Sequence, residues 1–299
     1  MDLPIDCTLG SDCFIQQYVD HDASERSWDF RCSPLSYDTH QGTDFALRSL
    51  DDMRQGVDVL AAAGGTVRGT RDGMEDRLFR ADDAARIGGR DCGNGGVVDH
   101  GDGWTTQYCH LKQGSVQVRT GDKVRTGTIL GQVGLSGRTQ FPHIHMTVRK
   151  DGDVVDPFDP DGVIQCDAPS DVTLWQDPPA YQPGGVRAVG FADAIPDFDA
   201  IKDGTAGALR LPDDAPALIV YGYAFGSKSG DQMQLRIDGP EGTVINETVS
   251  LDRTQAQLFR AVGKRRTTDA WATGTYLGTV ILRRDQREVS RLQSTMRID

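Results

Sequence analysis

Apolar and polar residues alternate in short segments along much of the chain, a pattern typical of half-buried β-strands. Over residues 143–150, for example, Ile144 and Met146 fall on one face of a strand and their polar neighbours fall on the other. The first half of the chain has several such segments separated by glycine turns, at residues 95–100, 105–111, 116–119, 124–133 and 143–150. Because short turns join strands that run in opposite directions, we expect an antiparallel sheet.

One segment of the first half favours a helix instead. Within residues 74–86, Leu78 and Phe79 contribute to a weak apolar stripe at helical spacing. A stripe this weak is typical of a helix with little core to bury. We therefore interpret residues 72–92 as a surface insertion between the strands.

A segment rich in proline and glycine divides the chain. Residues 167–185 contain four prolines and end in Gly184 and Gly185, and beyond them the sequence has no cysteine or histidine. We therefore expect a first domain over residues 1–166, a linker over residues 167–185 and a second domain over residues 186–299. A chain of 299 residues is long enough for each domain to bury its own core.

The second domain also has the pattern of a β protein. Short alternating segments with regular turns are expected at residues 187–192, 218–225, 233–238, 243–250, 257–262, 276–283 and 289–296. Strands of this number and spacing are typical of a β-sandwich, and the domain loosely resembles immunoglobulin-like domains. The predicted fold is therefore mainly β, an antiparallel β-sheet domain followed by an immunoglobulin-like β-sandwich.

Charge and hydropathy exclude two classes of protein. The chain has 44 acidic and 32 basic residues and a net charge of −12, so its average field repels nucleic acid. Its longest apolar runs, such as residues 217–220, are too short for a transmembrane segment. The composition gives no indication of oligomeric state.

The cysteines indicate disulfides and export. There is an even set of six and no Cys-x-x-Cys pair: Cys7, Cys13, Cys32, Cys92, Cys109 and Cys166. Cys7 with Cys13 and Cys92 with Cys109 are close enough in sequence to close local loops, which leaves Cys32 and Cys166 to join the ends of the domain, although other pairings are open. Because disulfides persist in oxidising compartments, we expect a periplasmic or extracellular protein. The first residues do not resemble a signal peptide, so we expect a processed chain behind an added Met.

Two histidines in one strand are the first candidates for chemistry. His143 and His145 are two positions apart, so both side chains leave the same face of an extended strand, with a repeat of roughly 7 Å. His40 and Asp44, far upstream, have a spacing that allows them to join one of these histidines around a metal ion. A site of two histidines and one carboxylate suits zinc and leaves a fourth position for water.

Several short motifs occur in this chain in the same order as in a known protein family. The chain contains His40-Gln-Gly-Thr-Asp44, then Tyr108-Cys-His110-Leu, then His143-Ile-His145. Together with Val-Asp-His-Gly at residues 98–101, Thr-Gly-Asp-Lys-Val at 120–124 and Val-Asp-Pro at 155–157, they resemble the lysostaphin/LytM-type zinc metalloendopeptidases, which cut peptidoglycan cross-bridges. The resemblance covers approximately residues 38–158.

The resemblance implies a role for each matching residue. His40, Asp44 and His145 become the ligands of Zn²⁺, and His110 and His143 become the catalytic pair. One imidazole accepts a proton as general base and the other donates to the oxyanion, with the assignment between them open. The implied function is hydrolysis of peptide cross-links in bacterial peptidoglycan by zinc-activated water. Glycine bridges and D-Ala-diaminopimelate cross-links both stay open as substrates.

Two alternative functions are a non-catalytic wall-binding or regulatory role and a lipoyl or biotinyl carrier domain. Relatives that bind or regulate the cell wall without catalysis lack metal-site residues, whereas this chain keeps all five. A glycine turn pattern over residues 116–131 also looks like lipoyl or biotinyl carrier domains, but none of the nearby lysines lies at a predicted hairpin tip. His100 and His21 are interpreted as structural, and the second domain as a binding or positioning module.

Overall fold

The computed structural model describes residues 1–163, 166 and 171–299. The chain divides into two units, Met1–Tyr181 and Gln182–Asp299. Of the expected linker, residues 167–170 lie outside the described part of the chain.

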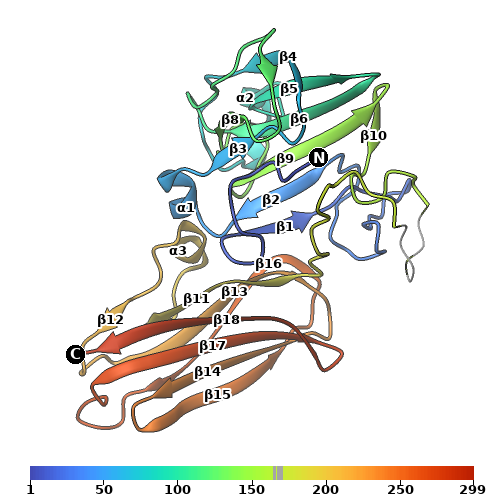
Figure 1. Ribbon diagram of the computed structural model, residues 1–299. Coiled ribbons are helices and arrows are strands. Elements are labelled where there is room, and N and C mark those ends of the chain that lie inside the picture. The colour runs from blue at the N-terminus through green and yellow to red at the C-terminus, as the bar shows by residue number, and fades with distance from the viewer. Residues whose placement is uncertain (164–165, 167–170) are drawn as a thin grey trace. The chain divides into compact units, whose positions relative to one another are not determined.

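An antiparallel sheet with the order β1-β2-β9-β6-β5-β4-β7 is the centre of the first unit, and β10 pairs with β9 (Figure 1). Its strands are β1 (Cys13–Gln17), β2 (Thr43–Leu47), β4 (Gly65–Arg71), β5 (Asn94–Gly101), β6 (Trp104–Leu111), β7 (Lys123–Val124), β9 (His143–Lys150) and β10 (Asp153–Val155). Strands β3 (Asp58–Leu60) and β8 (Ile129–Gln132) form a separate pair, and helix α1 (Leu50–Gln55) follows β2. This order places β2 and β6 on either side of β9, so three strands that are distant in sequence lie side by side in the sheet.

The predicted strands at residues 95–100, 105–111 and 143–150 are confirmed as β5, β6 and β9. The segment at residues 124–133 is shorter than predicted, because a turn with Gly127 at a φ of 80° separates β7 from β8. The strand predicted at residues 116–119 is wrong. That segment packs Val116 and Val118 against the core, which explains its apolar alternation, without being a strand.

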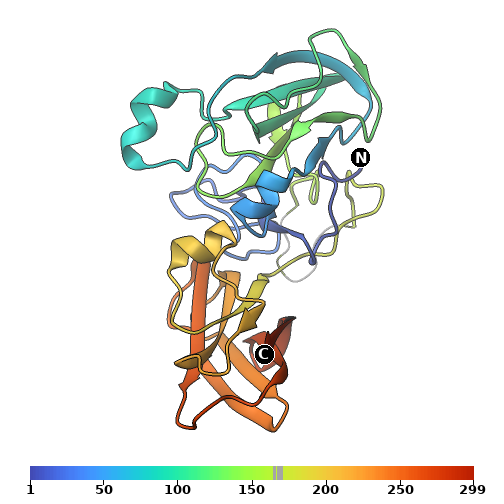
Figure 2. The ribbon, with the colours of Figure 1, turned by 90° about the vertical axis from the view of Figure 1, so that its left-hand side faces the viewer.

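The helix predicted over residues 74–86 is mostly wrong. The backbone N–H groups of Arg77 and Phe79 donate to Leu135 and Thr139 carbonyls in a neighbouring loop rather than to their own segment. Helical structure begins only at η1 (Ala81–Asp83) and continues as α2 (Ala84–Ile87). Figure 2 shows this insertion as a loop that stands away from the sheet, so its surface position agrees with the prediction although its backbone does not.

Disulfides and a buried core hold the first unit together. The bonds Cys7–Cys13, Cys92–Cys109 and Cys32–Cys166 are present, which confirms the pairing suggested by sequence spacing. The core lies under the sheet and includes the buried face of β9. Its members include Ile15, Phe45, Val98, Tyr108, Ile144, Met146 and Val148. The apolar positions of β9 thus face the core, and the opposite face is left for His143 and His145.

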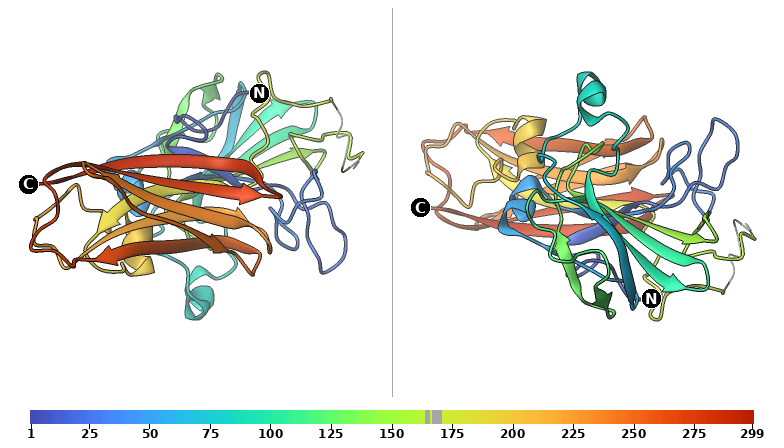
Figure 3. Two further views of the ribbon diagram at one scale, coloured as in Figure 1. Left: turned by 90° about the horizontal axis from the view of Figure 1, so that it is seen from below. Right: turned by 90° about the horizontal axis from the view of Figure 1, so that it is seen from above.

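The second unit consists of two sheets around one core, and Figure 3 shows its long strands lying side by side. One sheet has β11 (Gly185–Ala192), β13 (Ala217–Ser227) and β16 (Gln255–Arg265); the other has β12 (Arg210–Leu211), β18 (Arg287–Ile298), β17 (Gly274–Arg284), β14 (Gln232–Gly239) and β15 (Gly242–Ser250). Apolar residues of both sheets, such as Val220 and Leu235, share this core. Helix α3 (Phe198–Asp203) packs Ile201 on Tyr221 and Tyr223.

The mainly β fold with antiparallel sheets is therefore confirmed, and the comparison with immunoglobulin-like domains stays a prediction. Every strand expected in the second domain has a counterpart among β11 and β13 to β18. Among the described residues, the helices are all too short or too polar for a membrane crossing.

Candidate metal centre

The side chains of His40, Asp44 and His145 converge on one point beside the central sheet. His40 Nε2 lies 3.2 Å from Asp44 Oδ1 and 3.1 Å from His145 Nδ1, and His145 Nδ1 lies 2.8 Å from Asp44 Oδ1. All the donor atoms are within 4.8 Å of one another. Asp44 on β2 stands directly opposite His145 on β9, and side chains of opposite residues share one face of a sheet.

The segment before β2 brings His40 to these strands. His40 Nδ1 lies 2.6 Å from the carbonyl oxygen of Tyr18, which only accepts, so Nδ1 carries the proton and Nε2 faces Asp44. Gly42 makes this approach possible, because a Cβ there would lie 2.6 Å from the Met146 oxygen and 2.7 Å from His145 Nε2. The glycine of the His-Gln-Gly-Thr-Asp motif is thus required by packing against the metal site.

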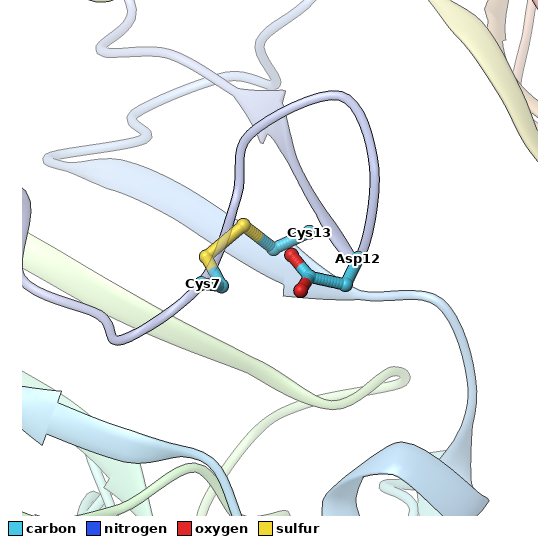
Figure 4. A group of neighbouring side chains, drawn as sticks. All are labelled: Cys7, Asp12 and Cys13. Carbon is cyan, nitrogen blue, oxygen red and sulfur yellow. A yellow bond between two sulfur atoms is a disulfide. The ribbon is translucent and has the colours of Figure 1, made fainter.

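A second group of candidate ligands, Cys7, Asp12 and Cys13, does not fit a metal. Both sulfur atoms are joined in a disulfide, as Figure 4 shows, and a disulfide sulfur is not a thiolate ligand. Asp12 Oδ1 accepts the backbone N–H of Thr8 at 2.6 Å. This group closes the loop before β1.

His110 and His143 lie beside the donor set. Their ring centres are 4.7 Å apart, and His143 Nε2 is 3.4 Å from Asp44 Oδ1. Nδ1 of His110 is 2.8 Å from the carbonyl oxygen of Ser136, and Nδ1 of His143 is 2.9 Å from that of Phe141. Each imidazole therefore carries its proton on Nδ1 when neutral and presents Nε2 as the acceptor.

Burial and mutual charge set the protonation of this cluster. Burial alone would raise the pKa of Asp44, but the charges of His40 and His143 hold that pKa well below its usual range. Burial also lowers the pKa of His110 strongly, and the neighbouring charges of His143 and His145 lower it further. The pKa of His145 is lowered, mainly by burial. The site thus combines an ionised Asp44 carboxylate with the imidazoles of His110 and His145, which favour their neutral form.

His40 is the exception in this cluster. Its burial lowers its pKa, but the charge of Asp44 and the hydrogen bonds to Asp44 and Tyr18 outweigh burial and raise that pKa. A cation among these donor atoms would take the place of the His40 proton on Nε2, since both compete for the same lone pair. The donor chemistry, two imidazole nitrogens and one carboxylate oxygen, suits zinc.

An open cleft with a volume of about 290 Å³ reaches the donor set. Strand register explains its floor: Cys109 on β6 lies opposite His145, and Gln107 lies opposite Thr147. The cleft is lined by Tyr37, Gln41, Asp91, Cys92, Gln107, Cys109, His110, Arg138, His145, Thr147 and Arg149. The cleft therefore opens beside His145 and His110.

The remaining histidines have structural partners. His100 Nδ1 lies 2.8 Å from the Gly64 oxygen and its Nε2 lies 2.9 Å from Thr106 Oγ1. His21 Nε2 lies 2.8 Å from Asp156 Oδ2. Neither His100 nor His21 lines the cleft, in agreement with their interpretation from sequence.

Several cleft residues were not singled out from sequence. Tyr37 packs its ring 4.3 Å from that of His40, and Arg138 comes from the loop before β9. The sequence could have predicted a place for Arg149 in the cleft, because Arg149 lies four positions after His145 and alternation places both side chains on one face of the strand. Tyr37 and Arg138 belong to loops without periodicity, and no comparable signal identifies them.

The comparisons with known proteins agree with the motifs. The model of peptidase family M23 matches residues 38–157. The chain is 34% identical over 105 residues to the DD-carboxypeptidase/endopeptidase Mpg of Neisseria meningitidis serogroup B, a match that covers 35% of this chain and 22% of that protein. It is 30% identical over 121 residues to the cell division protein DipM of Caulobacter vibrioides, covering 40% of this chain and 18% of that protein. The chain thus spans about a fifth of the length of these curated relatives.

Solved structures of similar proteins include the catalytic domain of lysostaphin from Staphylococcus simulans. It is 23% identical with a TM-score of 0.29, and the match covers 40% of this chain and 76% of that one. A zinc-containing peptidase from Vibrio cholerae is 24% identical with a TM-score of 0.31, covering 49% of this chain and 39% of that one. The family match and the ordered motifs agree: residues 38–157 of this chain match peptidase family M23, the family that the resemblance predicted.

Proposed function

We propose that this protein is a zinc-dependent endopeptidase that hydrolyses peptide cross-links of bacterial peptidoglycan. The observation that carries the proposal is the convergence of His40, Asp44 and His145, whose donor atoms lie 2.8 to 3.2 Å apart. Zinc with ligand bonds of about 2.0–2.1 Å in tetrahedral geometry places its ligands roughly 3.3 Å apart, so these residues fit the ion. The name of the Neisseria relatives, DD-carboxypeptidase/endopeptidase, supports a peptidase.

The protein's own residues supply the rest of the chemistry. When bound, zinc polarises a scissile carbonyl and lowers the pKa of water. His110 and His143 each present Nε2 beside the donor set, and one of these two atoms would take a proton from water and return it to the leaving amine. The carbonyls of Ser136 and Phe141 fix both tautomers and so keep these Nε2 atoms available.

The test separates metal binding from turnover. Zinc content is measured by elemental analysis, and cross-linked muropeptides are digested and analysed by mass spectrometry. We expect His145→Ala to lose both zinc and cleavage, whereas His110→Ala and His143→Ala keep zinc and lose cleavage. His100→Gln, which removes a histidine outside the cleft, should keep both. Undiminished cleavage by His145→Ala would refute the proposal.

The same experiment distinguishes the proposal from the alternative of a non-catalytic wall-binding or regulatory protein. That alternative predicts no cleavage product from any muropeptide, even with a full equivalent of zinc. Nothing in the site favours it, because the donor atoms of His40, Asp44 and His145 converge and the rings of His110 and His143 lie beside them.

We also propose a periplasmic or extracellular location, supported by the three disulfides, which persist in oxidising compartments. Titrating free thiols in the protein isolated without reductant tests this location, and six titratable thiols would contradict it.

For the second unit we propose a role in binding or in positioning the first unit on its substrate. Its test compares how much of the full chain, and of a chain without residues 182–299, sediments with purified cell wall.

A further inference from the structure

Arg149 occupies the cleft floor in line with the metal site. His145, Thr147 and Arg149 alternate on one face of β9, and all three line the cleft. Four residues of strand place Arg149 about 13 Å from His145 along the chain, a span that three or four extended peptide residues cover. A peptide whose scissile bond lies at the metal donors therefore passes within reach of Arg149.

The guanidinium of Arg149 is held in place by neutral groups. Its Nη2 donates to Gln41 Oε1 at 2.8 Å, and its Nη1 donates to the carbonyl oxygen of Gly152 at 3.2 Å. Among the described residues, no carboxylate oxygen lies within 4.0 Å of it. Gln41 follows the metal-site residue His40, so the same loop positions both groups. A guanidinium fixed without a carboxylate in a protein of net charge −12 is suited to an anion from outside.

Arg138, the other arginine of the cleft, is different. Its Nε lies 3.8 Å from Asp91 Oδ1, and its guanidinium lies over the ring of Phe79 at 5.0 Å. Its charge is therefore partly balanced within the protein. Of the two arginines, Arg149 is the one with a charge left for a ligand.

We infer that Arg149 binds a free carboxylate of the substrate, so that the peptides cleaved are anionic cross-links of the diaminopimelate type and not neutral glycine bridges. Diaminopimelate carries one carboxyl group beyond the one used in the chain, whereas internal glycine residues carry none. A guanidinium pairs with a carboxylate through two parallel hydrogen bonds, which a carboxamide of the same shape cannot reproduce. This inference rests on the proposed function for the position of the scissile bond.

The experiment uses the full chain and two matched probes. One is a muropeptide dimer cross-linked through diaminopimelate with free carboxylates, and the other is the same dimer with those groups converted to carboxamides. Both kcat/KM for cleavage and Kd for binding are measured, for the unmodified protein and for Arg149→Gln, Arg149→Lys and Arg125→Gln. Arg125 is an exposed arginine on a turn outside the cleft, so its variant removes the same charge from elsewhere.

We expect the unmodified protein and Arg125→Gln to prefer the acid over the amide by about 10-fold, the order of one charge-assisted contact. Arg149→Gln should abolish that preference by weakening the acid alone, and Arg149→Lys should restore part of it. Equal use of both probes by the unmodified protein, or an unchanged preference in Arg149→Gln, overturns the inference. Selective binding without cleavage would support the carboxylate site while refuting the peptidase proposal, so the two failures are distinguishable.

Discussion

The backbone N–H of His110 donates to the carbonyl oxygen of Cys92 at 2.8 Å, and a disulfide joins Cys92 to Cys109, the residue before His110. His110 has a φ of 65°, which a residue with a side chain rarely adopts without support from its surroundings. The hydrogen bond and the disulfide together tie the end of the 72–92 insertion to β6. They therefore hold His110 in the conformation that turns its imidazole toward the cleft.

Replacing Cys92 and Cys109 together by serine should lower kcat by about 10- to 100-fold while zinc content stays the same, because a displaced imidazole no longer reaches the reacting atoms. Unfolding measured by denaturant should show a loss of about 2–4 kcal/mol. The matched control replaces Cys7 and Cys13, a local disulfide away from the cleft, and should lower stability without lowering kcat. A double variant of Cys92 and Cys109 with full kcat would contradict the positioning role.

Gly42→Ala should weaken zinc binding, because the added Cβ would fall 2.6 Å from the Met146 oxygen and displace His145. We expect zinc affinity to fall by about 10- to 100-fold, the range seen when the support of a metal ligand is disturbed. Competition with a chelator measures the affinity. Gly69→Ala is the control, since its added Cβ meets no atom within 4 Å. Equal affinities for the two variants would argue against the packing explanation.

Tyr108→Phe should lower stability rather than activity. The Tyr108 hydroxyl is buried, accepts the backbone N–H of Ala62 at 2.8 Å and lies 3.0 Å from Thr106 Oγ1. Removing the hydroxyl leaves that N–H without an acceptor, at a cost of about 1–3 kcal/mol. Chemical denaturation and kcat are both measured. The tyrosine of the Tyr-x-His-Leu motif would be a catalytic group instead if kcat fell with no change in stability.

The pair of His21 and Asp156 should make stability depend on pH. Burial lowers the pKa of His21, but the hydrogen bond and the charge of Asp156 outweigh burial, so the pKa is raised overall. The folded protein then holds the His21 proton more tightly than the unfolded chain. The stabilisation is fully present below about pH 6.5 and is lost as the pH rises through the folded pKa.

Urea unfolding of the protein and of His21→Gln, followed from pH 5.5 to pH 8.5, measures this contribution. The difference in free energy of unfolding between the two proteins should shrink as the pH rises. A difference that stays constant across this range would show that the pair contributes no proton linkage.

Sequence predicted the fold best where local pattern and burial agree. In β9 the apolar positions Ile144 and Met146 are fully buried and His143 and His145 lie on the opposite face, so alternation alone identified the strand and the shared face of its two histidines. At residues 116–119 the same alternation was misleading. Val116 and Val118 pack on the core from a segment whose backbone does not enter the sheet, and apolar pattern reports burial rather than hydrogen bonding.

The candidate site was predictable to a similar extent. Motif order placed His40, Asp44, His110, His143 and His145 in one site, and the structure brings them together in one cluster that the cleft reaches at His110 and His145. The contacts that orient them were not predictable, because the carbonyls of Tyr18, Ser136 and Phe141 belong to loops and every residue type carries a carbonyl. Residues 74–80 were missed for a related reason, since their backbone partners lie in a distant loop.

The donor set joins β2 to β9, and Asp44 is 101 residues from His145 in sequence. During synthesis, the growing polypeptide cannot chelate the ion until β9 has left the ribosome and docked against β2. Under the proposed function, capture of the cation is therefore a late event in maturation, and it reports that β2 and β9 have paired.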